Sequence, residues 1–214
     1  MAARRVREEM PLSEGPVQHA SPSFDVVALA ASAGGLQALI RVLEGLPGDF
    51  QAAIVIVQHL DPRHRSLIAD VSGRRTALKG KEAEEGDRLS PGMVYTAPPN
   101  RHLLVNPDGS LSLSQSELVH FVRPSADLRF ESVAAAYKDR AIAVVLSGTG
   151  ADGAMGLRAI KKMGGTNIVQ DQKTSAFFGM PGAAIETGTV DFVLPLEDIA
   201  SALVTLVEGR SNFE

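Results

Sequence analysis

Three polar residues with complementary chemistry each follow an apolar run that is typical of a strand buried on both faces. Ser32 follows the run DVVALAA, His59 follows AAIVIVQ, and Asp152 lies in the segment that follows AIAVVL. A serine hydroxyl becomes a nucleophile when a base takes its proton, and histidine is the base best matched to neutral pH. A carboxylate behind the imidazole fixes its tautomer and stabilises the imidazolium. The three residues therefore predict nucleophilic catalysis if the fold brings the strand ends together.

The residues around the serine are small. Ala30-Ala31-Ser32-Ala33-Gly34 is similar to the G-x-S-x-G nucleophile elbow, with alanine in place of the first glycine. Such a turn lifts the serine oxygen away from the backbone. The helix expected after the turn offers free backbone N–H groups to an oxyanion.

Each of the three residues also has a structural interpretation when it is taken alone. Ser32 and Asp152 are both favoured residue types for capping the helix that follows them, and His59 could simply end a strand. The coincidence of the three types at three strand ends favours the catalytic interpretation. Their order along the chain is Ser–His–Asp, whereas α/β-hydrolases have the order Ser–Asp–His, so an ordinary α/β-hydrolase is not expected.

The apolar runs alternate along the chain with segments of helical periodicity. This alternation predicts an α/β fold, a doubly wound and mostly parallel sheet with helices on both faces and an antiparallel hairpin insertion. In such sheets ligands bind at the carboxyl ends of the strands. The expected strands are 25–31, 52–57, 93–97, 141–146, 166–170 and 190–194, with a hairpin of 102–105 and 110–114 around the turn NPDG; the expected helices are 36–46, a segment around 67–71, 125–139, 153–163, 181–187 and one that starts at Pro195.

Composition limits the domain organisation and the classes of partner. The chain has 214 residues, 44% of them hydrophobic, and its net charge of −4 argues against nucleic-acid binding. The absence of cysteine excludes disulfides, thiolate catalysis and cysteine-ligated zinc, and the five histidines lack metal-ligand spacing. We therefore expect no cofactor and no metal. The patterning predicts a tail or linker remnant at 1–24, a catalytic domain at 25–209 and a short tail at 210–214.

Nothing in the sequence predicts membrane insertion or export. No apolar run approaches the roughly 20 residues of a membrane span. The N-terminal segment MAARRVREEM has no apolar stretch after its arginines, as a secretory signal would. We therefore expect a cytoplasmic protein.

A competing interpretation comes from a glycine-rich loop. Residues 148–153 read GTGADG, which fits G-x-G-x-x-G, follow an expected strand and open an expected helix. Asp171 ends the next strand at about the spacing of a ribose-binding acid. A dinucleotide-binding module is thus an alternative, although Asp152 would place a carboxylate where the pyrophosphate should lie.

Six short segments, occurring in order, resemble the catalytic domain of the chemotaxis-type protein-glutamate methylesterases, the CheB family. They are ASAGG, VQHLDP, VYTAPPNRHLLV, RPSAD, LSGTGADGAMGL and FGMPGAAIETG. The resemblance implies a serine hydrolase that demethylates glutamate γ-methyl esters on chemoreceptors, releasing methanol, and that also deamidates receptor glutamines. It implies Ser32 as the nucleophile, His59 as general base and then acid, and Asp152 as the orienting acid. The implied partner is the cytoplasmic domain of a methylated chemoreceptor.

The resemblance also implies a substrate and oxyanion region around the nucleophile. The residues expected there are Ala33, Gly148, Thr149, Gly150, Arg123 and Met180. A structural ion pair explains Arg123 equally well, and core packing explains Met180 equally well. Thr149 stands where some members have methionine near the oxyanion site.

Regulation is where the sequence departs from the full-length members of the family. Those members carry an N-terminal receiver domain, and residues 1–24 are too short to form one. Control by phosphorylation in cis is therefore not expected, and a separate regulatory protein is a candidate partner. A regulatory domain with little turnover, serving signalling outside chemotaxis, is the remaining alternative.

Overall fold

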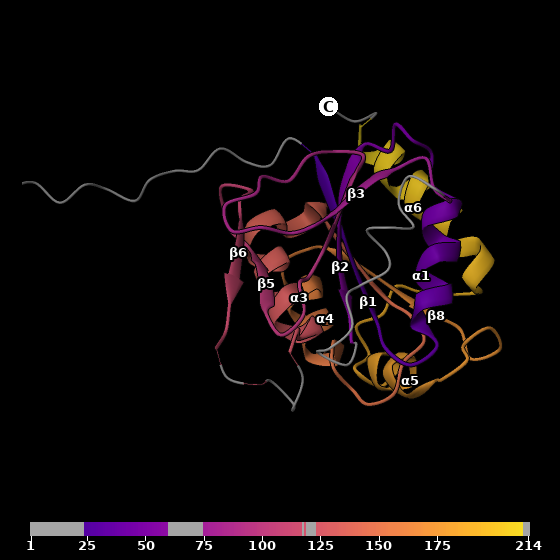
Figure 1. Ribbon diagram of the computed structural model, residues 1–214. Coiled ribbons are helices and arrows are strands. Elements are labelled where there is room, and N and C mark those ends of the chain that lie inside the picture. The colour runs from indigo at the N-terminus through magenta and orange to yellow at the C-terminus, as the bar shows by residue number, and fades with distance from the viewer. Residues whose placement is uncertain (1–23, 60–74, 117, 119–122, 212–214) are drawn as a thin grey trace, which may run out of the picture.

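The computed structural model describes residues 24–59, 75–116, 118 and 123–211, and these build a parallel sheet with helices on both faces (Figure 1). The sheet has seven strands in the order β3-β4-β2-β1-β7-β8-β9, and every neighbouring pair is parallel. Two further strands, β5 and β6, pair antiparallel as a separate hairpin. The strands are β1 (Asp25–Ala31), β2 (Ala52–Gln58), β3 (Lys79–Glu82), β4 (Met93–Thr96), β5 (His102–Val105), β6 (Leu111–Ser114), β7 (Ala141–Val145), β8 (Thr166–Gln170) and β9 (Phe192–Leu194).

The central strands are buried on both faces, which explains their continuous apolar runs. Every residue of β1, β2 and β7 is buried. Successive side chains of a strand point to opposite faces, so β1 supplies two separate cores. Val26 and Ala28 pack into one core, and Val27 and Leu29 pack into the other.

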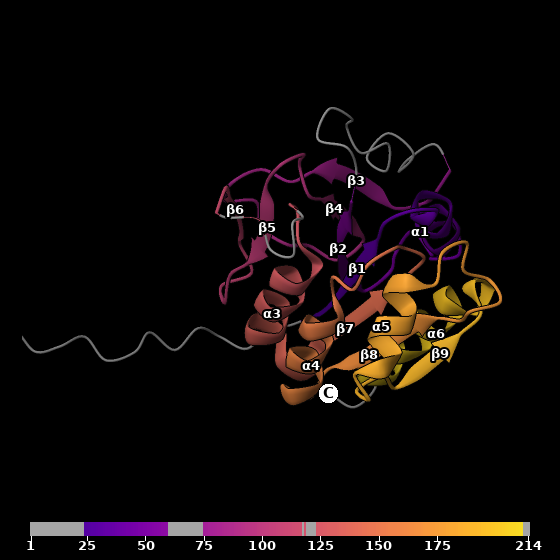
Figure 2. The same cartoon turned by 90° about the horizontal axis from the view of Figure 1, so that it is seen from below.

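Helices close the two cores from opposite sides (Figures 1 and 2). One side is covered by α1 (Gly35–Glu44) and α6 (Leu196–Ser211), which contact each other. The other side is covered by α3 (Ala126–Tyr137), α4 (Ala154–Lys162) and α5 (Gly179–Glu186); a 3₁₀ turn, η1 (Lys138–Arg140), leads from α3 into β7. No helix in the described ranges is long and apolar enough to cross a membrane.

The order of the strands reverses direction at one place in the sheet. From β1 the chain adds β2 and β4 on one side, whereas β7, β8 and β9 are added on the other side. The carboxyl ends of β1 and β7 therefore border the crevice in which doubly wound sheets bind their ligands. Ser32 and the segment that begins at Ser147 both leave the sheet at this crevice.

The predicted fold class is confirmed, and so is the hairpin between the middle strands. Strand β3, with the sequence KGKE, was not predicted because its residues are polar and only partly buried. It is held by parallel backbone pairing with β4. Helix α5 begins at Gly179, two residues before the expected start at Pro181, because proline is tolerated anywhere in the first turn. The helix expected around 67–71 lies outside the described residues, and the boundaries at 24/25 and 209/210 stay predictions.

Close packing of α3 on α4 depends on a glycine in the middle of α4. A Cβ atom on Gly156 would lie 2.6 Å from the Cβ of Phe130 and 3.0 Å from the carbonyl oxygen of Asp127. Both neighbours belong to α3. The glycine therefore sets the distance between the two helices, and with it the position of the side chains at their N-termini.

We expect Gly156→Ala to destabilise the protein even though alanine normally favours a helix. Overpacking of this kind costs about 1–3 kcal/mol, which exceeds the gain of about 1 kcal/mol in helix propensity. The matched control is Gly209→Ala in α6, where an added Cβ would meet no atom within 4 Å. Urea unfolding should show a lower free energy of unfolding for Gly156→Ala and an equal or higher one for Gly209→Ala. Equal stability of both variants would contradict the packing argument.

Candidate active site

Ser32 is the first residue after β1, and hydrogen bonds of its backbone fix it at the crevice. Its N–H donates to the carbonyl oxygen of Ser147 at 3.0 Å, and its own carbonyl accepts from Gly35 N–H at 2.8 Å. Gly34 adopts a left-handed conformation (φ 70°) and is the N-cap of α1, which has no side-chain cap. The alternative in which Ser32 caps this helix is therefore not realised, and its hydroxyl is available for other contacts.

The small residues around Ser32 are required by close approach of the backbone. A Cβ on Gly35 would lie 2.5 Å from the Cβ of Ala31. A Cβ on Gly148 would lie 2.9 Å from the Cβ of Ser32 and 2.3 Å from the sulfur of Met180. Two loops thus meet at the serine with no room for larger side chains.

His59 follows β2 and lies next to the serine. Ala31 and Gln58 pair in the parallel register of β1 and β2, and His59 N–H donates to the carbonyl oxygen of Ala31 at 3.0 Å. The Nε2 atom of the ring forms a hydrogen bond of 2.8 Å with Oδ2 of Asp152. Within the described residues no hydrogen bond joins the hydroxyl of Ser32 to the ring, a contact that is often loose without substrate.

The carboxylate of Asp152 is buried and accepts four hydrogen bonds. Besides His59, its Oδ2 accepts from Ala126 N–H at 2.6 Å, while Oδ1 accepts from Asp127 N–H at 3.1 Å and from Ser125 Oγ at 2.9 Å. Burial raises the pKa of Asp152, but the hydrogen bonds from His59 and from the backbone outweigh burial and bring the pKa below its ordinary value. The residue is thus held as the anion. It does not cap α4, as one alternative had it, but lies at the N-terminus of α3.

Asp127 makes the reciprocal contact. Its Oδ1 accepts from Gly153 N–H at 3.0 Å and from Gly156 N–H at 2.7 Å, both at the start of α4. Asp152, which precedes α4, thus accepts from the start of α3, and Asp127, in the first turn of α3, accepts from the start of α4. A carboxylate is favourable at the N-terminus of a helix. Because Asp127 occupies these N–H groups, they are not free to bind the pyrophosphate of a dinucleotide. Asp171, which the dinucleotide-binding alternative assigns to the ribose, accepts hydrogen bonds from the N–H and the hydroxyl of Thr174 in its own loop.

Some of the other residues expected near the substrate and the oxyanion lie next to Ser32 or are exposed, whereas others are buried or engaged in structural contacts. Ala33 lies beside Ser32 at the start of the α1 turn, and Thr149 and Gly150 are exposed in the loop after β7. Met180 is only 1% exposed and packs against Gly148, which favours the core-packing interpretation of its side chain.

Arg123 is committed to structural contacts. Its Nε donates to Asn100 Oδ1 at 2.9 Å, and its Nη1 donates to the carbonyl oxygens of Gln115 and Ser116 at 3.0 and 2.6 Å. This guanidinium joins the segment after the β5–β6 hairpin to the segment before β5. The contacts favour the structural interpretation of Arg123 over a role in steering a substrate.

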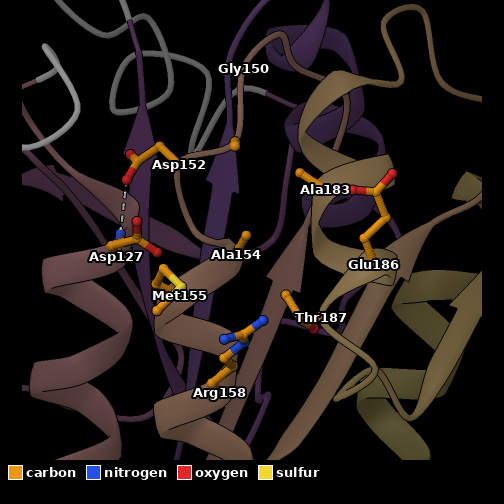
Figure 3. A pocket seen from close by; sticks show the side chains of 10 residues that line it. Asp127, Gly150, Asp152, Ala154, Met155, Arg158, Ala183, Glu186 and Thr187 are labelled. Carbon is orange, nitrogen blue, oxygen red and sulfur yellow. Dashed lines mark hydrogen bonds between the residues drawn. The ribbon is translucent and has the colours of Figure 1, made fainter.

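A pocket of about 440 Å³ opens beside Asp152, between α4 and α5 (Figure 3). Met155 and Arg158 of α4 face it from one side, and Glu186 and Thr187 at the end of α5 face it from the other. Asp127 and Asp152 also line it. In the described ranges no group of three or more His, Asp or Glu side chains could hold a metal ion.

Sequence reasoning missed the residues that surround the acid. Ser125 caps α3 by accepting from Leu128 N–H and also holds Asp152, and the buried His102 accepts from Ser125 N–H at 3.2 Å. The preference of serine for the N-cap position could have placed Ser125 at the start of a helix. Nothing local in the sequence indicates that the same hydroxyl reaches a carboxylate 27 residues away.

The fold and these contacts define a class of protein: a doubly wound α/β domain with the side chains of a serine hydrolase at its topological switch point. The family model described as CheB methylesterase matches residues 27–203, and the chain belongs to this family. The solved catalytic domain of the CheB methylesterase of Thermotoga maritima is similar to it with a TM-score of 0.84 and 38% identity, covering 87% of this chain and 100% of that one.

Two relatives show how much of a longer protein the chain spans. It is 44% identical over 192 residues to a protein-glutamate methylesterase/protein-glutamine glutaminase of Moorella thermoacetica, covering 88% of this chain but 45% of that protein. It is 42% identical over 192 residues to a putative protein of the same name from Leptospira interrogans, covering 90% of this chain and 98% of that protein. The chain thus spans about half of the first relative and nearly all of the second.

The four hydrogen bonds to Asp152 predict how stability depends on pH. The folded-state pKa lies below the unfolded-state value, so the carboxylate stabilises the fold above about pH 4, and this contribution is lost as the pH falls through the folded-state pKa. Asp152→Asn should lower the free energy of unfolding at pH 7 by about 1–3 kcal/mol, because an amide has one acceptor oxygen for these donors.

The measurement is urea unfolding of wild type and Asp152→Asn at pH 7 and pH 3, with Asp49→Asn as the exposed control. We expect the deficit of Asp152→Asn to shrink at pH 3 and the control to match wild type at both values. A deficit of the same size at both pH values would show that the charge of Asp152 is not what stabilises the site.

Proposed function

We propose that this protein is a serine hydrolase that removes methyl groups from glutamate γ-methyl esters of a protein substrate. The observation that carries the proposal is the contact of His59 with the buried, ionised Asp152 at the strand end next to Ser32. Membership of the CheB methylesterase family supports the choice of ester. The names of the two relatives also support a second activity, the deamidation of glutamine.

The geometry suggests a role for each nitrogen of the imidazole. Asp152 accepts the hydrogen bond from His59 Nε2, so Nδ1 is the nitrogen that takes the proton of the Ser32 hydroxyl. The serine oxygen then forms a bond to the ester carbonyl carbon, and the carbonyl oxygen takes up the negative charge. The anionic Asp152 stabilises the imidazolium that results.

The ester is cleaved in two steps. The C–O bond to the methoxy group breaks, the proton on His59 Nδ1 passes to the leaving oxygen, and methanol departs from an acyl-enzyme on Ser32. Water then gives a proton to the same nitrogen and attacks the acyl carbon. The bond to Ser32 breaks as the serine oxygen recovers its proton, which leaves the free glutamate.

The backbone that follows Ser32 suits the oxyanion. In the described part of the chain, Ala33 N–H and Gly34 N–H donate to no acceptor. They lie at the N-terminus of α1, which has no side-chain cap, so the helix dipole favours negative charge there. The exposed residues Thr149 and Gly150 follow Gly148, which lies against Ser32, and their N–H groups are the second candidates for oxyanion donors.

The proposed substrate is a methylated chemoreceptor, and the proposed location is the cytoplasm, where the methylated domain of such a receptor lies. A separate protein remains a candidate regulator. The dinucleotide alternative has less support because the N–H groups at the start of α4 and the carboxylate of Asp171 are both engaged within the chain.

Ser32→Ala should lower the rate of methanol release from a carboxyl-methylated chemoreceptor fragment by at least about a thousandfold, as expected for loss of a nucleophile. The matched control is Ser201→Ala, which removes an exposed hydroxyl on α6. This control should retain the wild-type rate. Full activity of Ser32→Ala would refute the assignment of the nucleophile, and no release by wild type would refute the proposed substrate.

A further inference from the structure

Phe177 has an exposed apolar ring, although its backbone N–H and carbonyl groups are both hydrogen-bonded. The residue is 47% exposed. Its N–H donates to Ser147 Oγ at 3.0 Å, and its carbonyl oxygen accepts from Gly148 N–H at 3.0 Å. An exposed ring on a fixed backbone loses little conformational freedom on binding, which is typical of residues that contact a ligand.

The ring is located at the turn that holds Ser32. A Cβ on Gly34 would lie 3.3 Å from Cδ2 of Phe177 and 2.7 Å from Cβ of Ala176, so the loop packs directly on this turn. The hydroxyl of Ser147 donates to Ala33 O at 2.9 Å while it accepts from Phe177 N–H. One hydroxyl thus joins the turn and the loop and fixes the ring beside the nucleophile.

We propose that Phe177 forms the apolar wall of the substrate site and binds the aliphatic part of the glutamyl methyl ester. This inference rests on the proposed esterase function and names the residue that recognises its substrate. The side chain of a glutamyl methyl ester has two methylene groups and a methyl group around one carbonyl. The exposed ring lies against Gly34 in the turn that holds Ser32, and contact of these groups with it removes apolar surface of both partners from water.

The ring lies against the turn that holds Ser32 and has no proton or charge to offer the reaction. Its contribution should therefore be to substrate binding, with little effect on the chemical step. Removing the ring should raise KM and leave kcat nearly unchanged. A ring that only supported the loop would act differently, because its loss would displace the turn at Ser32 and lower kcat.

The test compares wild type, Phe177→Ala, Phe177→Leu and Phe192→Ala as full-length chains. Phe192 is 43% exposed on the edge strand β9, three strands from β1, and is the matched control. The probe is a peptide with one glutamate γ-methyl ester, and methanol release gives kcat and KM. Thermal unfolding of each variant checks that it is folded.

We expect Phe177→Ala to raise KM roughly five- to fifteenfold, the effect of two apolar carbon groups losing contact with the ring. Phe177→Leu should recover most of the affinity, and Phe192→Ala should match wild type. An unchanged KM in Phe177→Ala, or a fall in kcat that leucine does not restore, would overturn the inference while leaving the esterase function intact. An inactive wild type would overturn both.

Discussion

The site depends on the burial of one carboxylate among donors that only the folded chain brings together. Asp152 receives the imidazole of His59 from the end of β2, the hydroxyl of Ser125 and two N–H groups of α3. An ionised carboxylate is costly to bury unless each oxygen is hydrogen-bonded, and here both are. The same group therefore stabilises the start of α3 and holds the imidazole of His59, so that the stability of the fold and the proposed catalysis have a common origin.

A second requirement is that the elements approach closely enough for these bonds to form. Glycine at position 156 lets α4 lie against α3, and Asp127 then reaches the N–H groups at the start of α4 while Asp152 reaches those of α3. Glycine at position 148 lets the loop after β7 touch Ser32. The close contacts at Gly35 and Gly148 explain why Ser32 is surrounded by alanine and glycine. A larger side chain at position 148 would separate Ser32 from the loop beside it.

Much of this arrangement is predictable from local patterns. The apolar runs of β1, β2 and β7 identify strands buried on both faces, and such strands in alternation with helices define a doubly wound sheet. The turn NPDG identifies the hairpin. Strand β3 is polar and could not be predicted from its sequence, because its backbone pairs with β4 while its side chains show no strand pattern. The cap that Asp152 provides to α3 also escapes, because a capping preference does not say which helix a side chain will reach. The exposure of Phe177 likewise depends on contacts between segments distant in sequence.

The central claim is that Ser32 becomes covalently acylated through a base held by Asp152. The most direct measurement is mass spectrometry of the protein after reaction with a serine-directed fluorophosphonate, followed by identification of the modified peptide. We predict a single adduct on Ser32 in the wild type and loss of that adduct in His59→Ala. An adduct on another serine, or equal labelling of Ser32 without His59, would contradict the account.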